Sequence, residues 1–288
     1  MTNHIPTLLQ REWMQHKRGW LIAAFAPPLL FLAMLPFGQV SGLPMDSPEL
    51  ISVGIVLISA CAVYAISLLV ALFQLPGLAR RDTQDRSIEF WLSLPGRPSE
   101  SVMATVLAHA WLAPLGGALV GVVLGLPIAL SVLTSRADFS TALAVNWGEV
   151  ILASTPLLLR GLAGTVPLML WLAPVIFVLM AASSWLKRLG TPVVLIGGGV
   201  AVGVLYKAYD IIWPLEALKN LNDHITRSLV HDGHSLAEAM QSGTNLVTWA
   251  LQDLSHALAE LASLEFLGWV AVAAAAFALV VMKRARGG

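Results

Sequence analysis

The chain has 288 residues, of which 57% are hydrophobic and only 12% are charged, and its 17 basic and 17 acidic residues give a formal net charge of zero. A soluble domain carries about twice that charged fraction, so this composition favours lipid as the main solvent. The absence of excess positive charge argues against nucleic acid as a partner, because binding it requires cations that neutralise phosphate. The single cysteine, Cys61, excludes an intramolecular disulfide and a cysteine-based zinc site.

Residues 5–19 are predicted to form an amphipathic helix that lies in the membrane interface. Leu9 and Trp13 recur at helical spacing, while Arg11 and Lys17 occupy the other face. Such a helix buries its apolar face at headgroup level and directs its cations towards anionic lipid, which makes membrane lipid a partner. An ordinary solvated helix that precedes the first membrane span is the alternative.

Six runs of the sequence are apolar and long enough to cross a bilayer, whose core requires about 20 apolar residues in a helix. The sequence therefore predicts an all-α integral membrane protein with a single transmembrane domain over residues 1–288. The predicted transmembrane helices cover residues 20–40, 50–76, 102–133, 164–186, 190–207 and 266–282.

The loop between the second and third spans, residues 80–97, contains a short charged helix. Asp85 or Ser87 can cap its start, and a Pro-Gly pair ends it. Its Phe90-Trp91 pair is a plausible docking surface, since aromatic residues and arginine dominate interface energetics. The alternative is a loop helix whose aromatic side chains anchor it to the bilayer surface.

Two further features lie within the spans. His109 is the ionisable residue that lies well inside them, with Lys207 at the end of the fifth span, and it is either a hydrogen-bonded interfacial residue or part of a proton relay. The fifth span contains a small-xxx-small face, which permits close approach of a second helix. This face is a candidate for contact between subunits, with packing inside one subunit as the alternative; it consists of Gly197, Gly198, Gly199 and Gly203.

Residues 208–265 form the one long polar region and are predicted to contain short helices that cap the outer mouth of the protein. A solvated polar loop is the favoured explanation of its histidines, and metal capture is the alternative; they are His224, His231 and His234.

Several catalytic motifs are absent from the sequence. None of the five lysines follows a glycine, so no Walker A loop exists and any ATPase must be another chain. The H-E-x-x-H and G-x-S-x-G motifs are also missing. We therefore expect this chain to be no enzyme and to hold no cofactor. The lack of carboxylates inside the spans argues against an ion-driven carrier.

Basic residues predict the orientation, because lysine and arginine near span ends remain in the cytoplasm. With both termini inside, twelve of the 17 basic residues and five of the 17 acidic residues face the cytoplasm. The zero net charge therefore conceals a positive inner surface and a negative outer surface.

The stretches REWMQHKRGW at residues 11–20 and DRSIEFWLSLP at residues 85–95, together with six spans, resemble the ABC-2 type permeases. These are the membrane subunits of bacterial ATP-binding cassette (ABC) exporters with type V, ABCG-like architecture. The resemblance implies a coupling helix in residues 80–97 that docks on a separate ATPase subunit, where ATP and Mg²⁺ bind. It also implies two permease copies around a pathway, with the glycines of the fifth span at the dimer contact or gate. The implied docking residues are Arg81, Asp85, Arg86, Ser87, Ile88, Glu89, Phe90, Trp91 and Leu94.

The expectation from the sequence is a homodimeric ABC export permease in a bacterial inner membrane, acting on an exported substrate of unknown identity. An ATP-independent secondary carrier and a non-transporting scaffold or sensor subunit are the alternatives.

Overall fold

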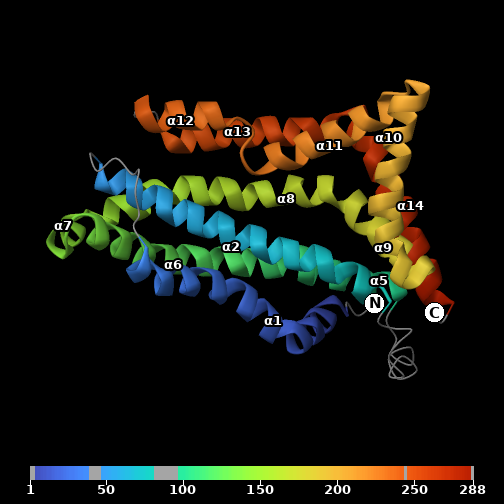
Figure 1. The fold of residues 1–288 in the computed structure, drawn as a ribbon, viewed down its shortest axis with the longest axis horizontal. Helices are drawn as coiled ribbons and strands as arrows, with labels where there is room; N and C mark the ends of the chain where they lie inside the picture. Colours follow the sequence, from blue (N-terminus) through green and yellow to red (C-terminus); the bar gives the residue numbers. More distant parts are fainter. Residues whose placement is uncertain (1–3, 39–46, 81–96, 243–244, 287–288) are drawn as a thin grey trace.

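The computed structural model describes residues 4–38, 47–80, 97–242 and 245–286, and every regular element in these residues is helical (Figure 1). Five helical segments within them are long and apolar enough to cross a membrane, which supports the predicted helical membrane protein. These segments are Ile5–Phe37, Pro48–Leu78, Pro98–Arg136, Trp147–Tyr209 and Leu264–Ala285.

The N-terminal segment is one continuous helix. Helix α1 (Ile5–Met34) joins the predicted interfacial helix 5–19 to the predicted first span, and the short η1 (Leu35–Phe37) follows it. The helix lies along one side of the bundle against α2 and α6 (Figure 1). Most of its apolar side chains stay exposed, as expected for a helix that faces lipid.

The centre of the bundle contains α2 (Pro48–Leu78) packed against α6 (Ala113–Arg136). Three glycines of α6, Gly117, Gly121 and Gly125, recur every four residues and let the two backbones approach closely. A Cβ atom at Gly121 would lie 2.6 Å from the carbonyl oxygen of Ser59. The glycines of α6 thus form a small-xxx-small contact with α2 inside the chain.

Helix α6 is reached through α5 (Pro98–Val106) and a π-helical turn, η2 (Leu107–Leu112). After α6, the short helix α7 (Phe139–Ala144) is capped by Asp138, whose carboxylate accepts from the backbone N–H of Thr141. That bond and a second one from the Ser140 hydroxyl lower the pKa of Asp138 below its ordinary value.

Helix α8 (Trp147–Leu186) has 40 residues and begins well before residue 164, where the sequence predicts the fourth span. At about 1.5 Å per residue it is roughly 60 Å long, about twice the thickness of a bilayer core. The chain turns at Lys187, whose φ is 56°. The fourth and fifth predicted spans therefore belong to one apolar segment, Trp147–Tyr209, which accounts for five segments where the sequence predicts six.

The segment predicted as the fifth span forms α9 (Gly190–Pro192), η4 (Val193–Gly197) and α10 (Gly198–Tyr209). Helix α10 runs across the end of the bundle, steeply inclined to α8 (Figure 1). A Cβ atom added at Gly198, Gly199 or Gly203 would meet no atom within 4 Å. The described residues of one chain therefore leave the predicted face uncovered at these three glycines.

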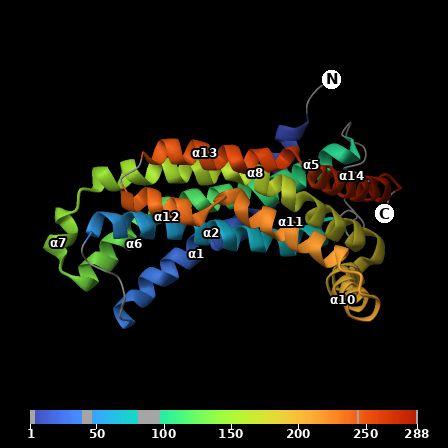
Figure 2. The same ribbon diagram turned by 90° about the horizontal axis from the view of Figure 1, so that it is seen from above.

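The region 208–265 lies along α8 and does not cap the end of the bundle (Figures 1 and 2). It contains α11 (Trp213–Leu229), α12 (Gly233–Ser242) and α13 (Leu246–Ala259), and α14 (Leu264–Ala285) follows. The region lies along α8 because α11 and α13 are amphipathic, and each packs its apolar face on α8. Those faces include Leu221 on α11, and Trp249 and Ala257 on α13.

Candidate functional site

The helix ends that carry most of the predicted cytoplasmic charge meet at one end of the bundle. Helix α2 ends there, α5 begins there, α8 ends there, and both ends of the chain lie there (Figure 1). The described basic residues on these segments are Arg11, Lys17, Arg18, Arg80, Arg97, Lys187, Arg188, Lys283, Arg284 and Arg286. The nine predicted docking residues all fall between Arg81 and Leu94, and they lie outside the described part of the chain.

At this end, a buried carboxylate joins α1 to the start of the third segment. We call Glu12, His16 and His109 the α1 cluster. Glu12 and His109 are fully buried, and the two side chains meet with Oε2 of Glu12 3.4 Å from Nε2 of His109. Thr105 on α5 donates its hydroxyl to Oε1 of Glu12 at 3.2 Å, and Arg11 donates to the same oxygen at 2.7 Å. Two elements far apart in sequence are thus tied together through one carboxylate.

Aromatic rings surround the α1 cluster. The His109 ring packs edge-on against His16, with 4.5 Å between centroids, and against Trp20, with 4.9 Å. A largely apolar cavity of 290 Å³ lies beside it, lined by residues that include Trp13, Trp20 and Gly116. In the α1 cluster, each of the three residues offers one possible metal-ligand atom, and these atoms lie within 4.8 Å of one another. No second group of three His, Cys, Asp or Glu residues meets this condition in the described part of the chain. The α1 cluster is therefore the described group that is arranged to hold a metal ion.

The sequence singled out His109 but not its partner. Glu12 lies 97 residues earlier, on a segment predicted to lie at the membrane surface, so no local pattern connects the two. The signal that was available is the i, i+4 spacing of Glu12 and His16, which places both side chains on one helix face.

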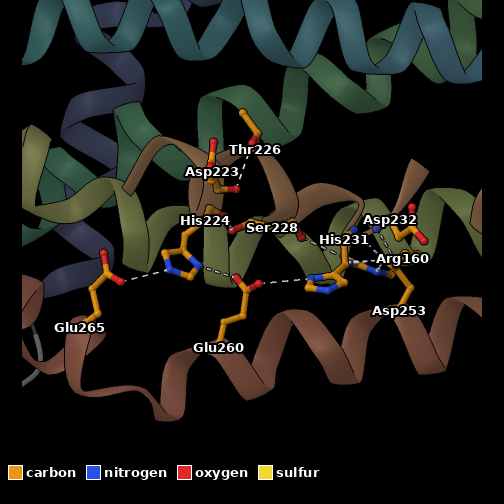
Figure 3. Close-up of polar contacts among 10 residues, drawn as sticks. All are labelled: Arg160, Asp223, His224, Thr226, Ser228, His231, Asp232, Asp253, Glu260 and Glu265. Carbon is orange, nitrogen blue, oxygen red and sulfur yellow. Dashed lines mark hydrogen bonds and ion pairs between the residues drawn. The ribbon is translucent and has the colours of Figure 1, made fainter. Parts of the chain in front are cut away.

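A second buried polar group connects α8 to the α11–α13 region (Figure 3). Nη2 of Arg160 lies 2.7 Å from Oδ2 of Asp253, and both side chains are almost fully buried. Asp253 also accepts from the backbone N–H groups of His231 at 3.0 Å and Asp232 at 3.1 Å. Arg160 donates through Nη1 to the carbonyl of Ser228 at 3.1 Å. This ion pair fixes the turn between α11 and α12 onto α8.

The histidines that the sequence proposed as metal ligands have different partners. His224 lies 2.7 Å from Glu260 and 3.7 Å from Glu265 (Figure 3). Its ring also stacks on Trp171. His231 faces the other oxygen of Glu260 at 3.4 Å. The third, His234, donates its backbone N–H to Asp232 at the start of α12. The structure thus brings His224 and His231 to one carboxylate and places His234 elsewhere.

Comparison of the chain with protein-family models, curated proteins and solved structures gave no match.

Proposed function

We propose that this chain is the membrane permease subunit of an ABC exporter, which forms a dimeric pathway driven by a separate ATPase subunit. The observation that supports the proposal is the buried Glu12 link between α1 and α5. Helix α5 begins at Pro98, directly after the predicted docking segment, and Thr105 and His109 follow within three turns. A docking segment and the N-terminal helix would therefore move together.

The proposed mechanism transmits the motion through these rigid contacts. Closure of the ATPase pair on ATP would displace residues 80–97, and α5 would follow because it continues that segment. Separating α1 from α5 would leave the buried Glu12 carboxylate without its partner on α5, which is unfavourable. Helix α1 would therefore tend to follow α5 during the movement. Rigid-body movement of two such halves would expose the pathway alternately to the two sides of the membrane.

The second subunit has a candidate contact at α10. The described residues leave its glycine face uncovered, and Val200 on α10 is at least half exposed, as are Val193 and Ile196 on the preceding η4. Exposed apolar area of this kind fits lipid or a second copy of the chain, and close helix approach at glycines favours the second copy.

Replacing the docking aromatics tests the proposal. We expect the ATPase subunit to co-purify with the wild-type protein from its native membranes. With Phe90→Ala and Trp91→Ala combined, we expect this subunit to be lost. Each buried aromatic hot spot contributes about 2 kcal/mol or more, so each replacement weakens association by about thirtyfold. The measurement is the amount of bound P-loop subunit and the ATP-dependent transport activity of the purified complex.

The matched control replaces two exposed aromatic residues at the opposite end of the bundle, Phe37→Ala with Phe139→Ala. This variant should keep the ATPase. If the docking variant retains both the ATPase and transport, or if the wild-type protein transports without an ATPase, the proposal is wrong and a secondary carrier becomes the better account.

The orientation is tested separately by labelling single cysteines from outside the cell. In a Cys61→Ala background, we expect Ser140→Cys and Ser255→Cys to react with a membrane-impermeant maleimide in intact cells. Arg188→Cys and Arg286→Cys should react only after permeabilisation, because the basic segments face the cytoplasm. All four positions are exposed. Labelling of Arg286→Cys in intact cells would contradict six crossings and favour five.

A further inference from the structure

We propose that the α1 cluster is a binding site for a divalent transition metal ion of the Zn²⁺ class, held by Glu12, His16 and His109. The ion would join α1 to η2 at the end of the bundle where both chain termini lie. This inference does not depend on the proposed transport function.

The first argument is the spacing of the donor atoms. Oε2 of Glu12 lies 3.4 Å from Nε2 of His109 and 3.5 Å from Nδ1 of His16. The His109 contact is a long hydrogen bond, since the usual N–H···O range is about 2.7–3.2 Å, and Nδ1 of His16 also lies 3.2 Å from the backbone carbonyl oxygen of Glu12, a contact that a bound ion would replace. Two ligands of a tetrahedral ion with bonds of about 2.0–2.2 Å lie roughly 3.4 Å apart. Both separations from Oε2 match that value, and all three donor atoms lie within 4.8 Å of one another.

The second argument is the orientation of the carboxylate. Its Oε1 atom already accepts from Arg11 at 2.7 Å and from Thr105 at 3.2 Å. These bonds hold the carboxylate with Oε2 facing the two imidazoles. Outer groups that orient a ligand in this way are a regular part of protein metal sites.

The third argument is the backbone that carries the ligands. Glu12 and His16 are four residues apart on α1, so their side chains lie on the same face one turn apart. His109 comes from the π-helical turn η2, and such turns occur frequently at functional sites. His16 is the most exposed ligand, with 22% of its side chain accessible, so water can complete the coordination from that side.

The donor set selects the class of metal. Two imidazoles and one carboxylate with an open fourth position is a ligand set typical of Zn²⁺, and imidazole also suits Cu²⁺ and Ni²⁺. Mg²⁺ and Ca²⁺ prefer oxygen ligands throughout.

The test uses the full-length protein in lipid nanodiscs, stripped with a chelator and then titrated with Zn²⁺ and with Co²⁺. We expect one ion per chain, the intense visible absorption of four-coordinate Co²⁺, and a Zn²⁺-dependent rise in the unfolding temperature. His16→Gln and His109→Gln should each lower the affinity by more than about tenfold, since even outer-shell changes cost 10–100-fold. His234→Gln, an exposed histidine outside the cluster, should leave the affinity unchanged.

Because His109 is fully buried, its variant can fail to fold, and the partly exposed His16 then decides the question. Three results would each overturn the proposal. They are less than one ion per chain at saturation, an affinity that His16→Gln leaves unchanged, and a Co²⁺ spectrum of an octahedral oxygen-ligated ion.

Discussion

Asp253→Ala is expected to destabilise the protein by about 3–5 kcal/mol, the cost of removing one partner of a buried ion pair. The substitution leaves the Arg160 guanidinium, which is 2% exposed, without its counter-ion. It also removes the acceptor for the backbone N–H groups of His231 and Asp232. The measurement is the free energy of unfolding in mixed micelles, followed by tryptophan fluorescence.

Two further variants show what the ion pair contributes. The double variant Arg160→Met with Asp253→Leu removes both charges, and such replacements are often neutral or stabilising. Here it should regain only part of the loss, because the two backbone N–H groups stay unpaired and each costs about 1–3 kcal/mol. Glu238→Ala, an exposed change on α12, should stay within about 0.5 kcal/mol of wild type. If Asp253→Ala changes stability no more than Glu238→Ala, the pair does not hold α13 to α8.

This pair also explains why the sequence misplaced the start of α8. A single arginine interrupts the apolar run, so hydropathy predicts that the span begins at residue 164. The structure continues the helix from Trp147 because Arg160 is neutralised by Asp253, 93 residues later. Hydropathy measures the cost of a charge in lipid, but it cannot include a partner that only the tertiary fold supplies.

In the candidate site too, contacts between residues close in sequence could be predicted, and contacts between distant segments could not. The helical class follows from long apolar runs, and the i, i+4 placement of Glu12 and His16 follows from helix geometry. The meeting of Glu12 with His109 does not, because it joins two segments 97 residues apart. The glycine motifs give a related lesson, since spacing alone cannot tell which glycine face is covered. In α6 it is packed on α2, and in α10 it is open.

Gly121→Ala is expected to destabilise the α2–α6 contact by about 1–3 kcal/mol, the usual cost of overpacking a tight interface. The added Cβ would lie 2.6 Å from the Ser59 carbonyl oxygen and 2.8 Å from the Cα atom of Ala60. Both are backbone atoms, so no side-chain rotation relieves the clash and α2 must shift as a whole. The measurement is again the free energy of unfolding in mixed micelles.

The same helix supplies the control, because a Cβ atom at Gly116 meets nothing within 4 Å. Gly116→Ala should stabilise the protein by about 0.5–1 kcal/mol, since alanine loses less backbone entropy than glycine in a helix. The two alanine variants, five residues apart, are therefore expected to change stability in opposite directions. Equal effects would show that helix propensity alone governs both sites and that α2 does not approach α6 at Gly121. Opposite effects would show that the close approach of α2 to α6 at Gly121 stabilises the centre of the subunit.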